Sequence, residues 1–115
     1  MAQRKIQIIK ATLFIDIDGT IIDAAENELP FAIEKINEAY DNDYTIIITT
    51  MRGDKYFDEK SRFSKENTLK LLRRLRIKYH EIIWDSPSPR IIINDEGIGT
   101  IKHPQYSSWE NYNFN

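Results

Sequence analysis

The chain of 115 residues contains no cysteine. This absence excludes disulfide bridges, zinc sites built from thiolates and catalysis by a cysteine nucleophile. Long hydrophobic runs are absent as well, because no window approaches the roughly 20 apolar residues that are needed to span a bilayer. The first twenty residues lack the apolar core and the small-residue cleavage site of a signal peptide. We therefore expect a cytoplasmic protein without a membrane partner.

Neither sign of charge dominates, since 16 Lys and Arg stand against 18 Asp and Glu, for a formal net charge of −2. This balance does not single out nucleic acid or an anionic membrane as the partner. Internal repeats and low-complexity segments are absent too. The length therefore predicts a single domain over residues 1–115.

Strand and helix patterns alternate along the chain. Apolar, β-branched runs predict strands at 10–18, 44–49, 81–84 and 90–94, and helical spacing predicts helices at 30–40 and 65–77. Pro30 suits the first position of the first helix, and Ser64 is a suitable N-cap for the second. This order predicts an α/β fold with a mainly parallel sheet flanked by helices.

Three segments fit this pattern less simply. Residues 21–28 are expected to form a short hairpin or flap, and the polar, aromatic tail from 98 onward has no assignment. The link at 85–89 is too short for the crossover that parallel neighbours need. Either the third and fourth strands are not parallel neighbours, or this link runs extended across the end of the sheet.

Two acidic residues, Asp16 and Asp18, end the first predicted strand and are followed by Gly19. Residues two apart on a strand point the same way, so both carboxylates are expected at the carboxyl end of the sheet. Two close carboxylates repel, and a hard cation such as Mg²⁺ compensates that repulsion. The alternative is a plain Asp-Gly turn, which the apolar strand on one side and the apolar pair on the other disfavour.

The stretch LFIDIDGTII resembles the first motif of the haloacid dehalogenase (HAD) superfamily, a hydrophobic strand followed by DxDGT. The resemblance implies a HAD-like Rossmannoid fold. It also implies that Asp16 is a nucleophile forming an aspartyl-phosphate, and that Asp18 is the general acid and base. Gly19 and Thr20 complete the motif and are expected to contact the substrate, because Gly19 lets a ligand approach the backbone closely.

Two further segments resemble later motifs of the same superfamily. The strand at 44–49 leads into Thr50 and Arg52, so the resemblance implies that Thr50 hydrogen-bonds the phosphoryl group and that Arg52 binds substrate. Asp95 follows the last apolar strand and is expected to bind Mg²⁺ together with Asp16 and the backbone carbonyl of Asp18. Each of these residues also has a plainer interpretation when it is taken singly. Thr50 suits the end of a β-strand, Arg52 suits an exposed loop, and Asp95 suits an Asx turn.

The third motif of the superfamily, which supplies a lysine, has no match here, because Asp85-Ser86-Pro87 stands in its place. Lys65, at the predicted start of the second helix, is the best substitute. A lysine at a helix N-terminus is disfavoured by the helix dipole, so a phosphate partner would explain it. The alternative is an ordinary exposed lysine.

The resemblance spans residues 11–97, and the segments between its motifs are too short for a cap domain. We therefore expect a capless, Mg²⁺-dependent phosphomonoester hydrolase, a HAD-type phosphatase, acting on a phosphorylated sugar or a similar small metabolite. One alternative is a polynucleotide end-phosphatase, which the basic strip on the second predicted helix supports weakly. Another is a catalytically weak HAD-fold binding or regulatory protein. The sequence is compatible with a monomer and with an oligomer.

Overall fold

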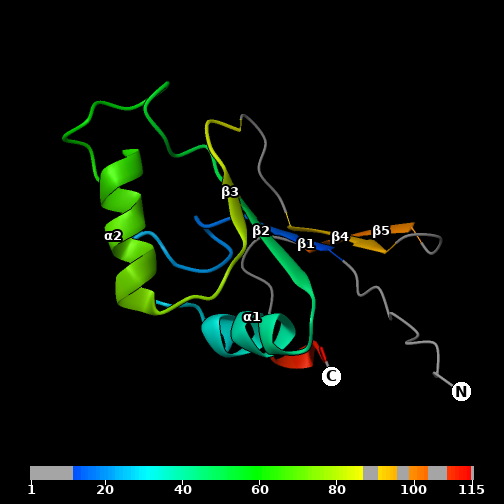
Figure 1. Ribbon diagram of the computed structural model, residues 1–115. Helices are drawn as coiled ribbons and strands as arrows, with labels where there is room; N and C mark the ends of the chain where they lie inside the picture. The colour runs from blue at the N-terminus through cyan, green and yellow to red at the C-terminus, as the bar shows by residue number, and fades with distance from the viewer. Residues whose placement is uncertain (1–11, 87–90, 96–98, 104–108, 115) are drawn as a thin grey trace, which may run out of the picture.

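Five strands form one sheet in the order β3-β2-β1-β4-β5 (Figure 1). The computed structural model describes residues 12–86, 91–95, 99–103 and 109–114. The strands are β1 (Thr12–Ile15), β2 (Thr45–Thr49), β3 (Glu81–Ile83), β4 (Ile91–Asp95) and β5 (Gly99–His103). The helices are α1 (Ala32–Asp41), α2 (Lys65–Leu75) and the 3-10 helix η1 (Trp109–Asn111).

The three strands β1, β2 and β3 run parallel, with Ile15 paired to Ile48 and Ile48 paired to Ile82. Each parallel connection contains one helix, α1 between β1 and β2 and α2 between β2 and β3. This alternation confirms the α/β class. It also brings the carboxyl ends of β1 and β2 to one edge of the sheet, where open α/β sheets bind ligands.

The direction of β4 differs from the expectation of a mainly parallel sheet. β4 pairs antiparallel with β1, and β5 pairs antiparallel with β4. Only seven residues, 84–90, separate β3 from β4, which is too few for a crossover helix. β4 therefore enters the sheet from the end at which β3 leaves it. Of the two paths considered for this link, the structure has the one in which β3 and β4 are not neighbours.

Both helices begin and end close to their predicted bounds. α1 starts at Ala32, and its N-cap Phe31 has φ 66°, so Pro30 precedes the helix rather than opening it. Ser64 caps α2 as predicted, accepting a hydrogen bond from the backbone N–H of Asn67. Among the described residues, we find no helix with the length and apolar character needed to cross a membrane.

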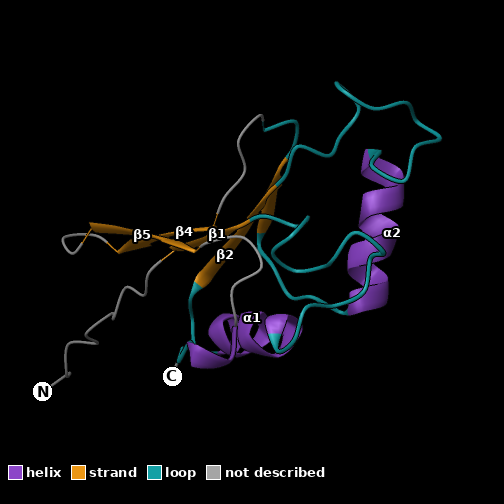
Figure 2. Ribbon diagram, turned by 180° about the vertical axis from the view of Figure 1, so that it is seen from behind, coloured by secondary structure: helices purple, strands orange, loops and turns teal. Residues whose placement is uncertain are grey.

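The hydrophobic core lies between the sheet and the two helices. Alternate residues of β1 and β2 are fully or almost fully buried, and they share one cluster with residues of α1 and α2. The segment that follows β1 lies between α2 and the strands in both Figure 1 and Figure 2. Its residues Ile17, Ile21 and Ile22 are fully buried. The strand and helix members of the core are Leu13, Ile15, Ile46, Ile48, Ala32, Ile36, Ala39, Leu71 and Leu72.

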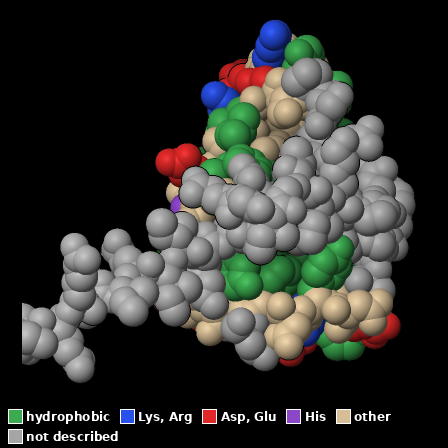
Figure 3. Space-filling view, turned by 90° about the vertical axis from the view of Figure 1, so that its right-hand side faces the viewer, with side chains coloured by type: hydrophobic (Ala, Val, Ile, Leu, Met, Phe, Trp, Pro, Cys, Tyr) green, Lys and Arg blue, Asp and Glu red, His purple; other side chains and the backbone are tan. Residues whose placement is uncertain are grey.

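The end of the chain contributes to this core. Trp109 and Phe114 are buried, Tyr112 packs beside them, and Phe114 meets Tyr44 edge to face. The aromatic tail, which had no assignment from the sequence, therefore covers hydrophobic surface through these residues. Tyr106 lies outside the described part of the chain. On the face that Figure 3 shows, hydrophobic side chains gather in a band in the lower half of the view.

Candidate functional site

Asp16 is the first residue after β1, and its side chain is 5% exposed. Its Oδ1 accepts a hydrogen bond of 2.7 Å from the backbone N–H of Ile17. Burial raises the pKa of Asp16 from 3.8 to about 7, and the charge of Asp18 adds to that rise. The structure therefore holds a carboxyl group whose ionisation is opposed by its surroundings, an arrangement that is common at catalytic positions.

This raised pKa predicts how Asp16 affects stability in the metal-free protein. Between pH 3.8 and about 7 the folded state keeps a proton that the unfolded chain has lost, so stability falls as pH rises through this window. In EDTA, we expect Asp16→Asn to raise the free energy of unfolding, by about 2–3 kcal/mol more at pH 8 than at pH 5. Urea denaturation at both pH values measures the difference, and an equal effect at both would contradict the raised pKa.

The motif turns sharply after Asp18. Gly19 has φ 77°, a conformation that glycine adopts at low cost, and its N–H donates to the carbonyl of Ile22 at 2.8 Å. Isolated bridges join Asp18 to Ile22 and Ile22 to Glu28, which confirms the predicted flap. The Thr20 side chain is buried, and the Thr20 carbonyl accepts a hydrogen bond of 2.8 Å from the indole Nε1 of Trp109.

Arg52 holds Asp18 through two charge-assisted hydrogen bonds. Its Nε donates to Asp18 Oδ2 and its Nη2 donates to Asp18 Oδ1, both at 2.8 Å. Burial alone would lower the pKa of the Arg52 guanidinium, but the hydrogen bonds and charge of Asp18 outweigh it and raise that pKa. Arg52 is 1% exposed, whereas the Asp18 side chain is 45% exposed. The pair therefore presents Asp18 to solvent and keeps the guanidinium inside.

Protein groups occupy the remaining sides of the Arg52 guanidinium. Nη2 lies 3.4 Å from Glu26 Oε2, Nη1 donates to the Arg62 carbonyl at 3.2 Å and to Thr68 Oγ1 at 3.4 Å, and the Phe63 ring lies 4.8 Å away. The donors of Arg52 are thus used by protein groups in this arrangement, and its role in binding substrate stays a prediction. The sequence did not single out Glu26, which lies in a polar stretch without a distinctive pattern.

Thr50 lies at the carboxyl end of β2, beside the end of β1. The register that pairs Ile15 with Ile48 places Thr50 next to the segment that follows Asp16. Thr50 is fully buried, and its Oγ1 accepts a 3.0 Å hydrogen bond from the backbone N–H of Arg52. A hydroxyl that accepts one bond can still donate its own proton.

Residues beyond β3 fix the backbone around Thr50. The Thr50 N–H donates to Ile83, and the Thr50 carbonyl accepts from Ser86. Gly53 has φ 148°, and a Cβ there would overlap the Asp85 carboxylate. Glycine is therefore required at this position for the loop after β2 to pass close to Asp85.

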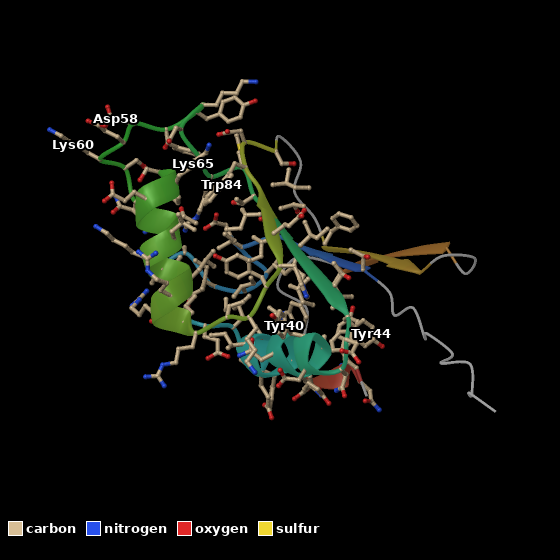
Figure 4. The ribbon with its side chains drawn as sticks, viewed as in Figure 1. Tyr40, Tyr44, Asp58, Lys60, Lys65 and Trp84 are labelled. Carbon is tan, nitrogen blue, oxygen red and sulfur yellow. The ribbon has the colours of Figure 1, made fainter. Side chains whose placement is uncertain are left out.

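Lys65 opens α2, but its described contacts do not include Asp16. The Lys65 Nζ lies 5.9 Å from the centre of the Trp84 ring, and the Lys65 backbone N–H donates to Asp54 Oδ1. Figure 4 shows Lys65 and Trp84 next to each other beyond the end of β3. The structure therefore places Lys65 on an aromatic ring, and its role as a substitute for the missing third-motif lysine stays a prediction.

Asp95 lies at the opposite end of β1 from Asp16. Asn94 is paired with Thr12 in the antiparallel register, so Asp95 lies beyond the amino end of β1, while Asp16 follows its carboxyl end. The four residues of β1 lie between the two positions, and five steps along the strand separate them by about 16 Å. The prediction that Asp95 binds a metal ion beside Asp16 is therefore contradicted, because the short link after β3 reverses the direction of β4.

The remaining oxygen donors suit a magnesium ion only in part. The described residues contain no group of three or more acidic, His or Cys side chains that could hold a metal. Both side-chain oxygens of Asp18 accept hydrogen bonds from Arg52. Of the predicted ligands near β1, the Asp16 carboxylate and the Asp18 main-chain carbonyl are those considered for the metal. Mg²⁺ often binds through one or two carboxylates, several waters and the phosphate of the substrate, so this small donor set still fits it.

Comparison of the chain with protein-family models, with curated proteins and with solved structures gives no match. The site is therefore interpreted from its own geometry and chemistry.

Proposed function

We propose that this protein is a HAD-type phosphatase, a Mg²⁺-dependent phosphomonoester hydrolase in which Asp16 is the nucleophile. The observation that carries the proposal is the buried Asp16 carboxyl at the carboxyl end of β1, with Asp18 two residues later and the Thr50 hydroxyl at the end of the neighbouring parallel strand. A carboxylate is a competent covalent nucleophile for phosphoryl groups.

In the first step, the Asp16 carboxylate attacks phosphorus, an aspartyl-phosphate bond forms, and the bond to the leaving oxygen breaks. Asp18, which takes up a proton before this step, gives that proton to the leaving oxygen. The buried Arg52 guanidinium holds the Asp18 carboxylate through two hydrogen bonds. The Asp18 side chain is still 45% exposed, so the substrate can reach it from solvent. Each carboxylate oxygen has two acceptor sites, so the pair with Arg52 does not block proton transfer.

In the second step, water attacks the phosphorus of the aspartyl-phosphate, Asp18 accepts the proton from that water, and phosphate leaves with Asp16 regenerated. The Thr50 hydroxyl donates a hydrogen bond to the phosphoryl group and helps to orient it in both steps. A bound Mg²⁺ would neutralise phosphate charge and favour the ionised form of Asp16. Asp16 and the main-chain carbonyl of Asp18 would hold it.

The substrate proposed first is a phosphorylated sugar or a similar small metabolite. This choice follows from the resemblance of the motifs to small capless members of the superfamily. A HAD-fold binding protein with weak catalysis is the alternative from another class, and the absence of a third-motif lysine is the feature that favours it.

The test is hydrolysis of p-nitrophenyl phosphate, followed by a panel of sugar phosphates. We expect release of phosphate that depends on Mg²⁺, stops in EDTA and returns when Mg²⁺ is restored in excess. Because the proposed donor set includes the phosphate of the substrate, Mg²⁺ should also bind more tightly in the presence of an unreactive phosphate analogue. Turnover that is indifferent to EDTA would contradict the metal, and no turnover on any phosphomonoester would leave the binding protein as the better proposal.

A further inference from the structure

A groove of about 320 Å³ lies between the flap and α2. Its lining comes from the flap, from the loop before α2 and from α2 itself, and it does not include Asp16 or Asp18. The lining residues are Glu26, Arg62, Asn67, Lys70, Leu71 and Arg74.

The inner end of this groove is joined to the candidate site through Arg52. Glu26 Oε2 lies 3.4 Å from Arg52 Nη2, and the Arg62 carbonyl accepts a hydrogen bond from Arg52 Nη1. The same guanidinium holds Asp18, the proposed acid for the leaving group. A leaving group next to Asp18 is therefore separated from the groove by a single side chain.

The charges of the groove favour an anion. Three of its six lining residues are cationic, Arg62, Lys70 and Arg74. Its one carboxylate, Glu26, already contacts the buried Arg52, which offsets part of its negative charge. Lys70 has an i,i+4 contact of 3.6 Å with the exposed Glu66, a type of pair that contributes little in water.

Arg62 fixes the position of one wall. Its Nη1 donates to the Ala24 carbonyl of the flap at 3.3 Å, and its guanidinium lies 4.6 Å from the centre of the Phe63 ring. The loop before α2 and the flap are thereby joined, so this wall is shaped before a ligand binds. Lys70 and Arg74 stand one helical turn apart on α2, which suits two oxygens of a single phosphate or neighbouring phosphates.

We propose that this groove binds a second phosphate on the leaving group of the substrate, with Lys70 and Arg74 as its main contacts. The inference rests on the proposed function and narrows its substrate to phosphomonoesters that carry another phosphate. Two sources have this chemistry, a small sugar bisphosphate and the phosphodiester backbone of an oligonucleotide with a terminal phosphate.

The first experiment measures binding rather than turnover, so that its result does not depend on catalysis. The full chain with Asp16→Asn is titrated by calorimetry, in Mg²⁺, with glucose 1,6-bisphosphate, glucose 6-phosphate and a short 3′-phosphorylated oligonucleotide. We expect the bisphosphate to bind about tenfold more tightly than the monophosphate, and Lys70→Gln with Arg74→Gln to remove that preference. Equal affinity for the two sugars and no effect of the substitutions on the oligonucleotide would overturn the proposal.

Arg73→Gln is the matched control. Arg73 lies on the same helix, is exposed, and does not line the groove, so its substitution changes the net charge by the same amount as Lys70→Gln or Arg74→Gln made singly. We expect Arg73→Gln to keep the preference for the bisphosphate. Loss of the preference in Arg73→Gln as well would show that only the general field of α2 matters, and the groove would be rejected.

The two phosphate sources and the two proposals separate in the same series. If only the oligonucleotide binds more tightly than glucose 6-phosphate, and the groove variants lose that difference, the groove is supported with a phosphodiester backbone as its ligand. A preference for the bisphosphate without any hydrolysis by the wild-type chain supports the groove and rejects the phosphatase. Hydrolysis of p-nitrophenyl phosphate, with no tighter binding of the bisphosphate or the oligonucleotide than of glucose 6-phosphate, supports the phosphatase and rejects the groove.

Discussion

Asp16→Asn is expected to lower kcat for p-nitrophenyl phosphate by at least about 1,000-fold, because the amide cannot form the acyl-phosphate bond. The substitution is nearly isosteric, and Asp16 is buried with its oxygen bonded to the N–H of Ile17, so the fold should be kept. The metal-free variant should even be more stable above pH 7, where the wild type carries a buried charge. Steady-state kinetics in Mg²⁺ together with urea denaturation measure both effects.

Asp43→Asn provides the matched control for this substitution. Asp43 is exposed and has φ 69°, a conformation that asparagine adopts readily, so the same chemical change there should leave kcat within twofold. A stable, folded Asp16→Asn protein that retains wild-type turnover would remove Asp16 from the mechanism. Trapping of phosphate on wild-type protein, and not on the variant, would identify the covalent step directly.

Arg52→Ala is expected to destabilise the fold by about 3 kcal/mol. The substitution removes a guanidinium that is 1% exposed, and it leaves Asp18 and Glu26 without their shared cation beside the buried Asp16. The expected loss lies at the lower end of the range for breaking a buried pair, because Asp18 is partly solvated and water replaces some of the lost interaction. Urea denaturation measures this loss of stability. The control is Arg73→Ala at an exposed position, which should stay within about 0.5 kcal/mol of wild type.

The kinetic effect of Arg52 separates positioning from folding. Arg52→Lys keeps the charge but cannot make two parallel hydrogen bonds to Asp18, so it should recover part of the stability and little of kcat. The KM for p-nitrophenyl phosphate should change less than kcat, since the donors of Arg52 are used by protein groups. A variant that raises KM strongly at unchanged kcat would restore Arg52 as a substrate-binding residue.

Local chemistry made several features predictable from the sequence. The strand formed by the apolar run before Asp16 and the cap at Ser64 each depend on neighbouring residues, and both were predicted correctly. The two βαβ units followed from the same alternation. The start of α1 was misplaced by two residues because Pro30 is accepted both at the first helical position and just before a cap.

Features that depend on distant partners could not be predicted in the same way. The position of Asp95 depends on the direction of β4, which follows from the length of the link after β3 and not from the motif around Asp95. The role of Arg52 depends on Asp18 and Glu26, which are 34 and 26 residues away in the sequence. A motif identifies a residue type at a strand end, whereas the contacts of that residue are set by the whole fold.

The hydrogen bond from the Trp109 indole to the Thr20 carbonyl joins residues 89 positions apart. A contact at such separation closes a long loop, and the entropy of that closure opposes its formation. During synthesis, the turn after Asp18 emerges from the ribosome long before the tryptophan that secures it. The turn that follows the proposed nucleophile and its acid is therefore completed by a side chain that the sequence supplies much later.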